Sequence, residues 1–138
     1  MYPKADIPVY QLSVNKLLSP LEHFNIGTQL KELRKKGILI MGSGNIVHNL
    51  SKVNFNKQNG YDWAYKFDNY IKEEVIQRNF NEILNYKSHE FANFAVPSPD
   101  HFYPLLYILG ASEKDDNIEI FNDECVLGSL SMTSYLIG

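Results

Sequence analysis

The sequence lacks three features that mark common classes of protein. Among 138 residues there is a single cysteine, Cys125, so no disulfide can form within the chain and no cluster of thiolates can hold a metal. No apolar run approaches the length of a transmembrane helix. The first six residues also lack the apolar stretch of a secretory signal. We therefore expect a cytoplasmic protein without a membrane partner.

Clustered positive charge is scarce as well. Thirteen Lys and Arg residues stand against sixteen Asp and Glu, which gives a formal net charge of -3. A protein that binds a nucleic-acid backbone needs a basic patch. The one short basic cluster, residues 34–36, falls at the predicted end of a helix, where positive charge interacts favourably with the helix dipole. Nucleic acid is therefore not an expected partner.

What the chain does contain is typical of one small soluble domain, residues 1–138. Its hydrophobic content is 44% and its charged content 21%. Nine Tyr, eight Phe and one Trp supply large apolar side chains for a core. The composition thus allows a folded domain but does not indicate a function.

Capping signals and apolar spacing predict the helices. Ser19, followed by Pro20 and then by Glu22, forms a capping box with proline in the first turn. Ser98 and Pro99 mark a second such start, and Pro104 should bend the helix that follows. A third helix is indicated by apolar residues three and four positions apart, at 64, 67, 71 and 75. The predicted helices are 20–36, 61–78, 80–86 and 101–109, and residues 88–97 are expected to be irregular.

Four segments have the composition of β-strands. Residues 6–14 and 38–41 are apolar, rich in β-branched side chains, and lie on either side of the first helix. Strand, helix and strand in this order predict a βαβ unit with parallel strands. Residues 118–122 and 128–136 predict a hairpin near the end of the chain. The expected fold class is therefore α/β.

His48 follows the predicted strand 38–41 and the turn Gly42-Ser43-Gly44. In open α/β sheets, ligands bind beyond the carboxyl ends of the strands, so this side chain is placed to reach a site. Position alone does not separate that role from a structural one. The same turn could bind phosphate, but no third glycine and no Gly-Lys-Ser/Thr sequence completes a known phosphate loop.

His101 is the second candidate, near the start of its predicted helix. The helix dipole there disfavours the imidazolium form, and a neutral imidazole is the form that binds a divalent metal. His23 and His89 lie in a helix predicted to be on the surface and in a polar stretch, respectively. For these two, a solvated or hydrogen-bonded structural histidine is the expected role.

Around the two candidate histidines the sequence resembles a known family. The match runs in order along essentially the whole chain and resembles the 4,5-DOPA extradiol dioxygenase family, the subunit-B type of class III ring-cleavage enzymes. The residues that carry it are "YPKADIPVYQLS" (2–13), "LRKKGILIMGSG" (33–44), "GSGNIVHNL" (42–50), "YDWAYKFDNYI" (61–71), "PSPDHFYPLLYILGA" (97–111) and "GSLSMTSYLIG" (128–138).

The resemblance implies a fold, a cofactor and two residue roles. The fold would be a three-layer α/β domain of the phosphorylase/hydrolase-like type, with a mixed or parallel sheet flanked by helices. The cofactor would be non-haem Fe(II), or Zn(II) in its place, with His101 as one metal ligand. His48 would be the catalytic acid/base, which takes a phenolic proton from a catecholic substrate and returns a proton as the ring opens.

The resemblance also implies that the metal site is incomplete. The other metal-binding histidines of the family lie in N-terminal motifs that this sequence does not contain. One histidine cannot hold a labile divalent ion, for which about three protein ligands are usual. We therefore expect the C-terminal half of the domain, inactive alone, which associates with a separate N-terminal half or with itself. The alternative is a non-catalytic relative that binds a protein or peptide.

Overall fold

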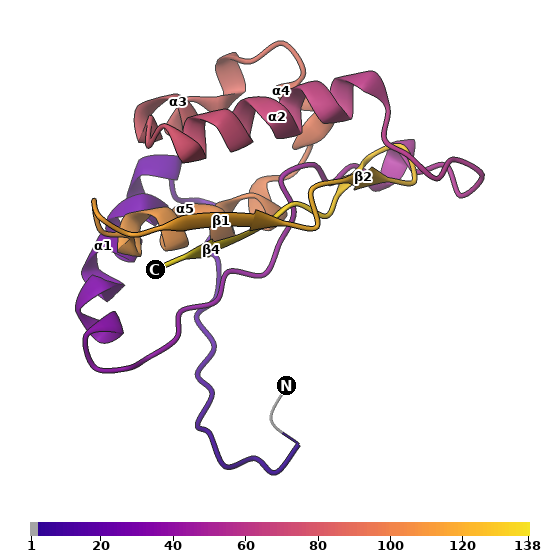
Figure 1. Cartoon of the computed structure of the whole chain (residues 1–138). Helices are drawn as coiled ribbons and strands as arrows, with labels where there is room; N and C mark the ends of the chain where they lie inside the picture. Colours follow the sequence, from indigo (N-terminus) through magenta and orange to yellow (C-terminus); the bar gives the residue numbers. More distant parts are fainter. Residues whose placement is uncertain (1–2) are drawn as a thin grey trace.

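The computed structural model describes residues 3–138, and its helices form two groups (Figure 1). The pair α1 and α5 lies beside a small β-ribbon, and α2, α3 and α4 lie together on the other side of α5. The helices are α1 (Pro20–Arg34), α2 (Asp62–Ile76), α3 (Phe80–Leu84), α4 (Ala92–Ala95) and α5 (Tyr103–Ala111), with 3-10 turns η1 (Leu50–Lys52), η2 (Tyr86–Ser88) and η3 (Pro99–His101). Within this described range, no helix has both the length and the apolar character needed to cross a membrane.

The capping box predicted for the first helix is present. The Glu22 backbone N–H donates to the Ser19 hydroxyl oxygen at 3.3 Å, and the Ser19 N–H donates to the Glu22 carboxylate at 2.7 Å. These two bonds satisfy donors that a helix start otherwise leaves unpaired. The helix ends at Arg34, close to the predicted end, and Gly37 follows with a φ of +74°. The sequence signals at both ends are thus confirmed.

Two glycines allow α1 and α5 to cross in close contact. The backbone of Gly27 in α1 lies against the Tyr107 carbonyl, and Gly110 in α5 lies against the Phe24 carbonyl. A Cβ atom at either glycine would overlap the facing backbone. Side chains on two packed helices normally hold their axes farther apart, so the absence of a side chain here sets the spacing.

We expect Gly110→Ala to lower the free energy of unfolding by about 1–3 kcal/mol, because the added methyl group forces the two helix backbones apart. Urea denaturation of the purified chain measures this change. Gly138→Ala is the matched control, since a Cβ at Gly138 meets only the end of the Arg34 side chain, at 3.8 Å. Equal stability of the two variants would contradict the close crossing.

The core is built on the apolar face of α2, as the spacing predicts. Ala64, Phe67, Ile71 and Val75 are all fully buried. They pack in one hydrophobic cluster with side chains of α3, α4, α5 and the turns between them. The helix ends at Ile76 and so is two residues shorter than predicted, because Arg78 has left-handed backbone with a φ of +56°.

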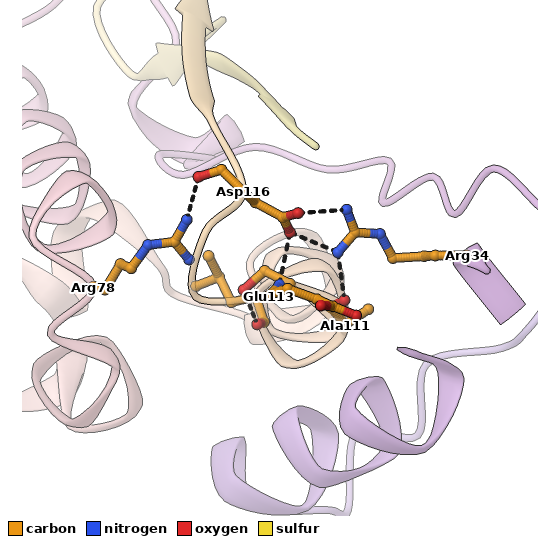
Figure 2. A network of polar contacts seen from close by, with 7 residues as sticks. Arg34, Arg78, Ala111, Glu113 and Asp116 are labelled. Carbon is orange, nitrogen blue, oxygen red and sulfur yellow. Dashed lines mark hydrogen bonds and ion pairs between the residues drawn. The ribbon is translucent and has the colours of Figure 1, made fainter. Parts of the chain in front are cut away.

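A polar network joins the ends of three helices (Figure 2). The Asp116 carboxylate accepts two hydrogen bonds from the Arg34 guanidinium, at 2.6 and 2.9 Å, and one from the Glu113 N–H at 2.6 Å. Arg34 also donates to the Ala111 carbonyl at 2.9 Å, and Arg78 donates to the Asp116 carbonyl at 2.6 Å. The hydrogen bonds from Arg34 hold the pKa of Asp116 below its usual value. This network fixes the turn between α5 and β1 against the ends of α1 and α2.

The described strands form two antiparallel pairs. Strand β1 (Ile118–Phe121) pairs with β4 (Ser134–Ile137), and β2 (Cys125–Val126) pairs with β3 (Leu130–Ser131). The predicted terminal hairpin is confirmed in outline. The predicted strand 128–136 is divided into β3 and β4, because its first part pairs with β2 and its last part with β1.

The strand predictions for residues 6–14 and 38–41 are wrong for this structure, and with them the βαβ unit. Neither segment is a strand in the described chain. A strand forms only where a neighbour accepts and donates its backbone hydrogen bonds, and neither segment pairs with a described strand. The α/β class is confirmed as a mixture of helices and strands, whereas the three-layer arrangement with a parallel sheet is not.

Candidate active site

His48 lies in an extended segment between two parts of the chain that are distant in sequence. Its N–H donates to the Ala95 carbonyl at 2.9 Å, and it forms an isolated antiparallel bridge with Leu130 of β3. The preceding residue, Val47, is fully buried and accepts a hydrogen bond from the Ser131 N–H at 2.9 Å. The His48 backbone is therefore held on both sides, which restricts where its half-buried side chain can point.

His101 is the last residue of η3, and its carbonyl holds the segment that carries His48. The Asn45 N–H donates to the His101 carbonyl at 2.9 Å. Gly44 lies so close to the same carbonyl that a Cβ atom would overlap it. This contact accounts for the Gly-x-Gly turn: its glycine lets the backbone approach His101, and the following N–H is already bonded. The phosphate-binding interpretation of the turn therefore has no structural support.

The imidazole rings of His48 and His101 are stacked. Their centroids are 3.8 Å apart and their planes are inclined by 20°. The sequence separates these residues widely, and the structure brings the two candidate site residues into direct contact. Two imidazoles at this distance cannot both be charged without strong repulsion, so the pair favours a state with at least one neutral ring.

Burial and the neighbouring charged groups shift the pKa of His48. Burial lowers its pKa below the usual histidine value, the neighbouring His101 lowers it further, and Asp100 opposes the shift. The Asp100 carboxylate lies 3.7 Å from His101 Nε2 and 3.5 Å from Lys16 Nζ, and it accepts a hydrogen bond from the Ser98 hydroxyl. At neutral pH the His48 ring is therefore neutral and able to accept a proton.

The structure near Ser98 differs from the predicted helix start. The Ser98 side chain bonds the Asp100 carboxylate rather than the helix backbone, so it does not cap a helix. Residues 99–101 form the 3-10 turn, and α5 begins at Tyr103. Pro104 consequently lies in the first turn of α5, where its missing N–H is tolerated, and not in the helix interior that the predicted bend assumed.

The other two histidines, His23 and His89, make hydrogen bonds away from the His48–His101 pair. His23 is completely buried, contrary to the prediction of a surface helix; its Nδ1 is 2.8 Å from the Tyr107 hydroxyl. His89 stacks on Tyr70 at 4.6 Å, and its Nδ1 accepts from the Phe91 N–H at 3.2 Å. Both are hydrogen-bonded structural histidines, as expected.

The donor atoms near His101 do not form a complete metal site. Within residues 3–138, no group of three or more His, Cys, Asp or Glu side chains is arranged to hold a metal ion. His101 is half-exposed and can offer one nitrogen, but a divalent ion in a catalytic site needs about three protein ligands. The described residues therefore do not fit a whole non-haem metal centre.

A buried carboxylate that the sequence motifs did not single out supports the His48 segment. Asp68 in α2 is 1% exposed and accepts hydrogen bonds from the hydroxyls of Ser131 and Thr133, the latter at 2.6 Å. Ser131 in turn bonds Val47, next to His48, through its backbone. Burial raises the pKa of Asp68. The signal was available: Asp68 lies within the apolar stripe of α2, where an acidic residue needs buried partners.

Comparison with known proteins identifies the family of the chain. A family model described as the catalytic LigB subunit of aromatic ring-opening dioxygenase matches residues 1–138. The chain is 40% identical to 4,5-DOPA dioxygenase extradiol of Escherichia coli, with 100% of this chain and 52% of the relative covered. It is 34% identical to the protein of the same name from Portulaca grandiflora, with 98% and 51% covered.

A solved structure shows the same arrangement. The crystal structure of an uncharacterized Escherichia coli protein superposes with a TM-score of 0.92 at 39% identity, and the match covers 100% of this chain and 58% of that one. The resemblance seen in the sequence is confirmed. The chain spans about half the length of the curated relatives it matches. On this evidence it belongs to the LigB family of aromatic ring-opening dioxygenases.

Proposed function

We propose that this chain is the C-terminal part of a single extradiol dioxygenase domain and contributes half of its active site. The observation that supports this most directly is the stacked pair His48 and His101, held by backbone contacts to β3, α4 and η3. The proposed substrate class is a catecholic aromatic, because both relatives are 4,5-DOPA dioxygenases.

His48 acts as the acid/base in this proposal. Its ring is neutral and half-buried, so it can accept a proton from a catechol hydroxyl and later return one to the opening ring. His101 lies against it and is free to donate a nitrogen to Fe(II) or Zn(II), the ions that this family resemblance implies.

The remaining ligands come from outside the described residues. A metal bound only by His101 would dissociate readily, so the isolated chain is proposed to be inactive. Activity requires a second polypeptide segment that completes the ligand set. The complete protein's substrate and activity therefore belong to the assembled domain rather than to residues 1–138 alone.

Metal content tests this division of the site. The test uses a chimera that supplies the missing part of the domain. In this single chain, residues 1–138 of this protein replace the matched part of the Escherichia coli 4,5-DOPA dioxygenase extradiol. We expect the chimera to retain about one Fe(II) or Zn(II) per chain after gel filtration, and the isolated chain to retain none, because only the chimera has about three ligands.

Substitution of His101 connects that result to this chain. His101→Ala in the chimera should weaken metal binding by at least about 10-fold, since it removes a ligand. His89→Ala, at a histidine with structural contacts only, is the control and should leave the metal content unchanged. Unchanged affinity in the His101 variant would show that His101 is not a ligand.

A further inference from the structure

Ser131 makes hydrogen bonds at two points to the segment that carries His48. Its backbone N–H donates to the Val47 carbonyl at 2.9 Å, directly before His48. Its carbonyl accepts a hydrogen bond from the Asn45 side-chain amide at 2.6 Å. The Asn45 backbone N–H in turn donates to the His101 carbonyl at 2.9 Å. One serine is therefore connected to both members of the stacked histidine pair.

The side chain of Ser131 is held by Asp68 of α2. Both residues are 1% exposed, and the Ser131 hydroxyl donates to one oxygen of the Asp68 carboxylate. The other carboxylate oxygen accepts from the Thr133 hydroxyl at 2.6 Å, and the Thr133 N–H donates to the Ser131 hydroxyl oxygen at 3.3 Å. Rotation of the Ser131 side chain would break two hydrogen bonds inside the core, where water does not replace them.

Packing alone does not account for a carboxylate at this position. Burial opposes the ionised form of Asp68 and raises its pKa. Its neighbours Phe67 and Ile71 in α2 are apolar and fully buried. An apolar side chain in a core avoids the desolvation cost of a carboxylate, but it cannot fix the direction of two hydroxyl groups. The carboxylate is therefore explained by what it holds in place.

The chain after His48 is held independently of Asp68. The Asn49 N–H donates to the Ser129 carbonyl at 3.1 Å, and the Asn49 carbonyl accepts from the Ser129 hydroxyl at 2.7 Å. These bonds remain when Asp68 is removed. Loss of Asp68 should therefore release only the segment before His48, and so change the direction in which its imidazole projects without unfolding the site.

We propose that Asp68, acting through Ser131, is a positioning residue that keeps the imidazole of His48 stacked against that of His101. Because the Asp68 carboxylate is buried, it acts only through the residues that it holds. The catalytic consequence rests on the function proposed above, whereas the contact between the two rings does not. A displacement of about 1 Å in a reacting group can cost on the order of 100-fold in rate.

NMR spectra of the isolated chain test the ring contact without metal or turnover. Stacked aromatic rings shield each other, so the ring protons of His48 and His101 should be shifted upfield and should show a nuclear Overhauser cross-peak between the two rings. Asp68→Ala should abolish this cross-peak and move both shifts towards those of free histidine. Asp68→Asn, which keeps one carbonyl acceptor, should restore the cross-peak.

Val75→Ala is the matched control for a general loss of stability. Val75 is fully buried in the same helix as Asp68, and its apolar side chain makes no hydrogen bond. The variant should lower the melting temperature of the chain and leave the cross-peak between the rings intact. A cross-peak retained in folded Asp68→Ala, or lost in Val75→Ala as well, would overturn the proposal.

Two variants that each remove a single hydroxyl give the same test at lower cost in stability. Ser131→Ala and Thr133→Val each remove one hydrogen bond to Asp68, but only Ser131 is bonded through its backbone to the segment before His48. Ser131→Ala should therefore lose the cross-peak and Thr133→Val should retain it. Equal behaviour of these two variants would overturn the proposal, also where Asp68→Ala does not fold.

Turnover by the chimera measures the catalytic consequence. Asp68→Ala should lower kcat for a catechol by about 10–100-fold with KM and metal content nearly unchanged, because Asp68 acts on His48 and contacts neither substrate nor His101. Val75→Ala should leave kcat nearly unchanged where it is folded. A normal kcat in Asp68→Ala would overturn the positioning role. A chimera without any substitution that turns over no catechol would contradict the proposed function, and the cross-peak in the isolated chain would then decide the role of Asp68.

Discussion

Replacing His48 with glutamine in the chimera is expected to lower the turnover of a catechol by about 10²–10⁴-fold, the usual contribution of a general acid/base. Glutamine can still hydrogen-bond but cannot take up and return a proton. The backbone hydrogen bond from His48 to Ala95 and the β-bridge with Leu130 involve no side-chain atom of His48, so both are retained in the glutamine variant. The fold and the metal content should therefore be unchanged.

Two comparisons make this result specific. His89→Gln is the control for loss of a histidine, because the His89 ring contacts Tyr70 and the Phe91 backbone in another part of the structure. Metal analysis of each variant separates loss of chemistry from loss of the ion. A His48 variant with nearly normal turnover would remove His48 from the catalytic role, whatever the state of the metal.

Asp68→Ala should have the largest effect on stability. The substitution leaves the buried hydroxyls of Ser131 and Thr133 without their acceptor and creates a cavity, and we expect the free energy of unfolding to fall by about 2–4 kcal/mol. Asp68→Asn keeps the volume and one carbonyl acceptor, so it should cost less. Urea denaturation measures both. A loss below about 0.5 kcal/mol for the alanine variant, as at an ordinary surface site, would contradict the role of the carboxylate.

The raised pKa of Asp68 predicts how stability changes with pH. Burial raises the pKa of Asp68 in the folded protein, so the folded state binds a proton that the unfolded state releases at about pH 4. The contribution of Asp68 to stability is therefore present below that pH, and is lost as the pH rises towards the raised pKa. Asp116 acts in the opposite direction, since its pKa is lowered by Arg34. The difference in the free energy of unfolding between wild type and Asp68→Asn, followed against pH, isolates the contribution of Asp68.

The parts of the fold that depend on neighbouring residues in sequence were predictable. The capping box at Ser19 and Glu22 and the buried stripe of α2 both arise from interactions within one helix or one of its faces. Such interactions are visible as fixed spacings in the sequence. Helix boundaries differed by a few residues where the backbone made a local turn, as at Arg78.

The parts that depend on distant partners were not predictable from spacing. Residues 38–41 have the composition of a strand, but a strand also needs a partner, and no described strand pairs with them. The burial of His23 follows from the close crossing of α1 and α5, which no pattern within α1 indicates. The contact between His48 and His101 likewise comes from packing of segments far apart in sequence, and only the family resemblance suggested it.

The central claim is that residues 1–138 carry half of a dioxygenase site and that the other half lies outside them. Oxygen uptake measured with the isolated chain and with the chimera, each given Fe(II), ascorbate and 4,5-dihydroxyphenylalanine (DOPA), tests it most directly. We expect no uptake and no yellow ring-opened product from the isolated chain, and both from the chimera. Sustained oxygen uptake by the isolated chain, or a folded chimera that consumes none, would contradict it.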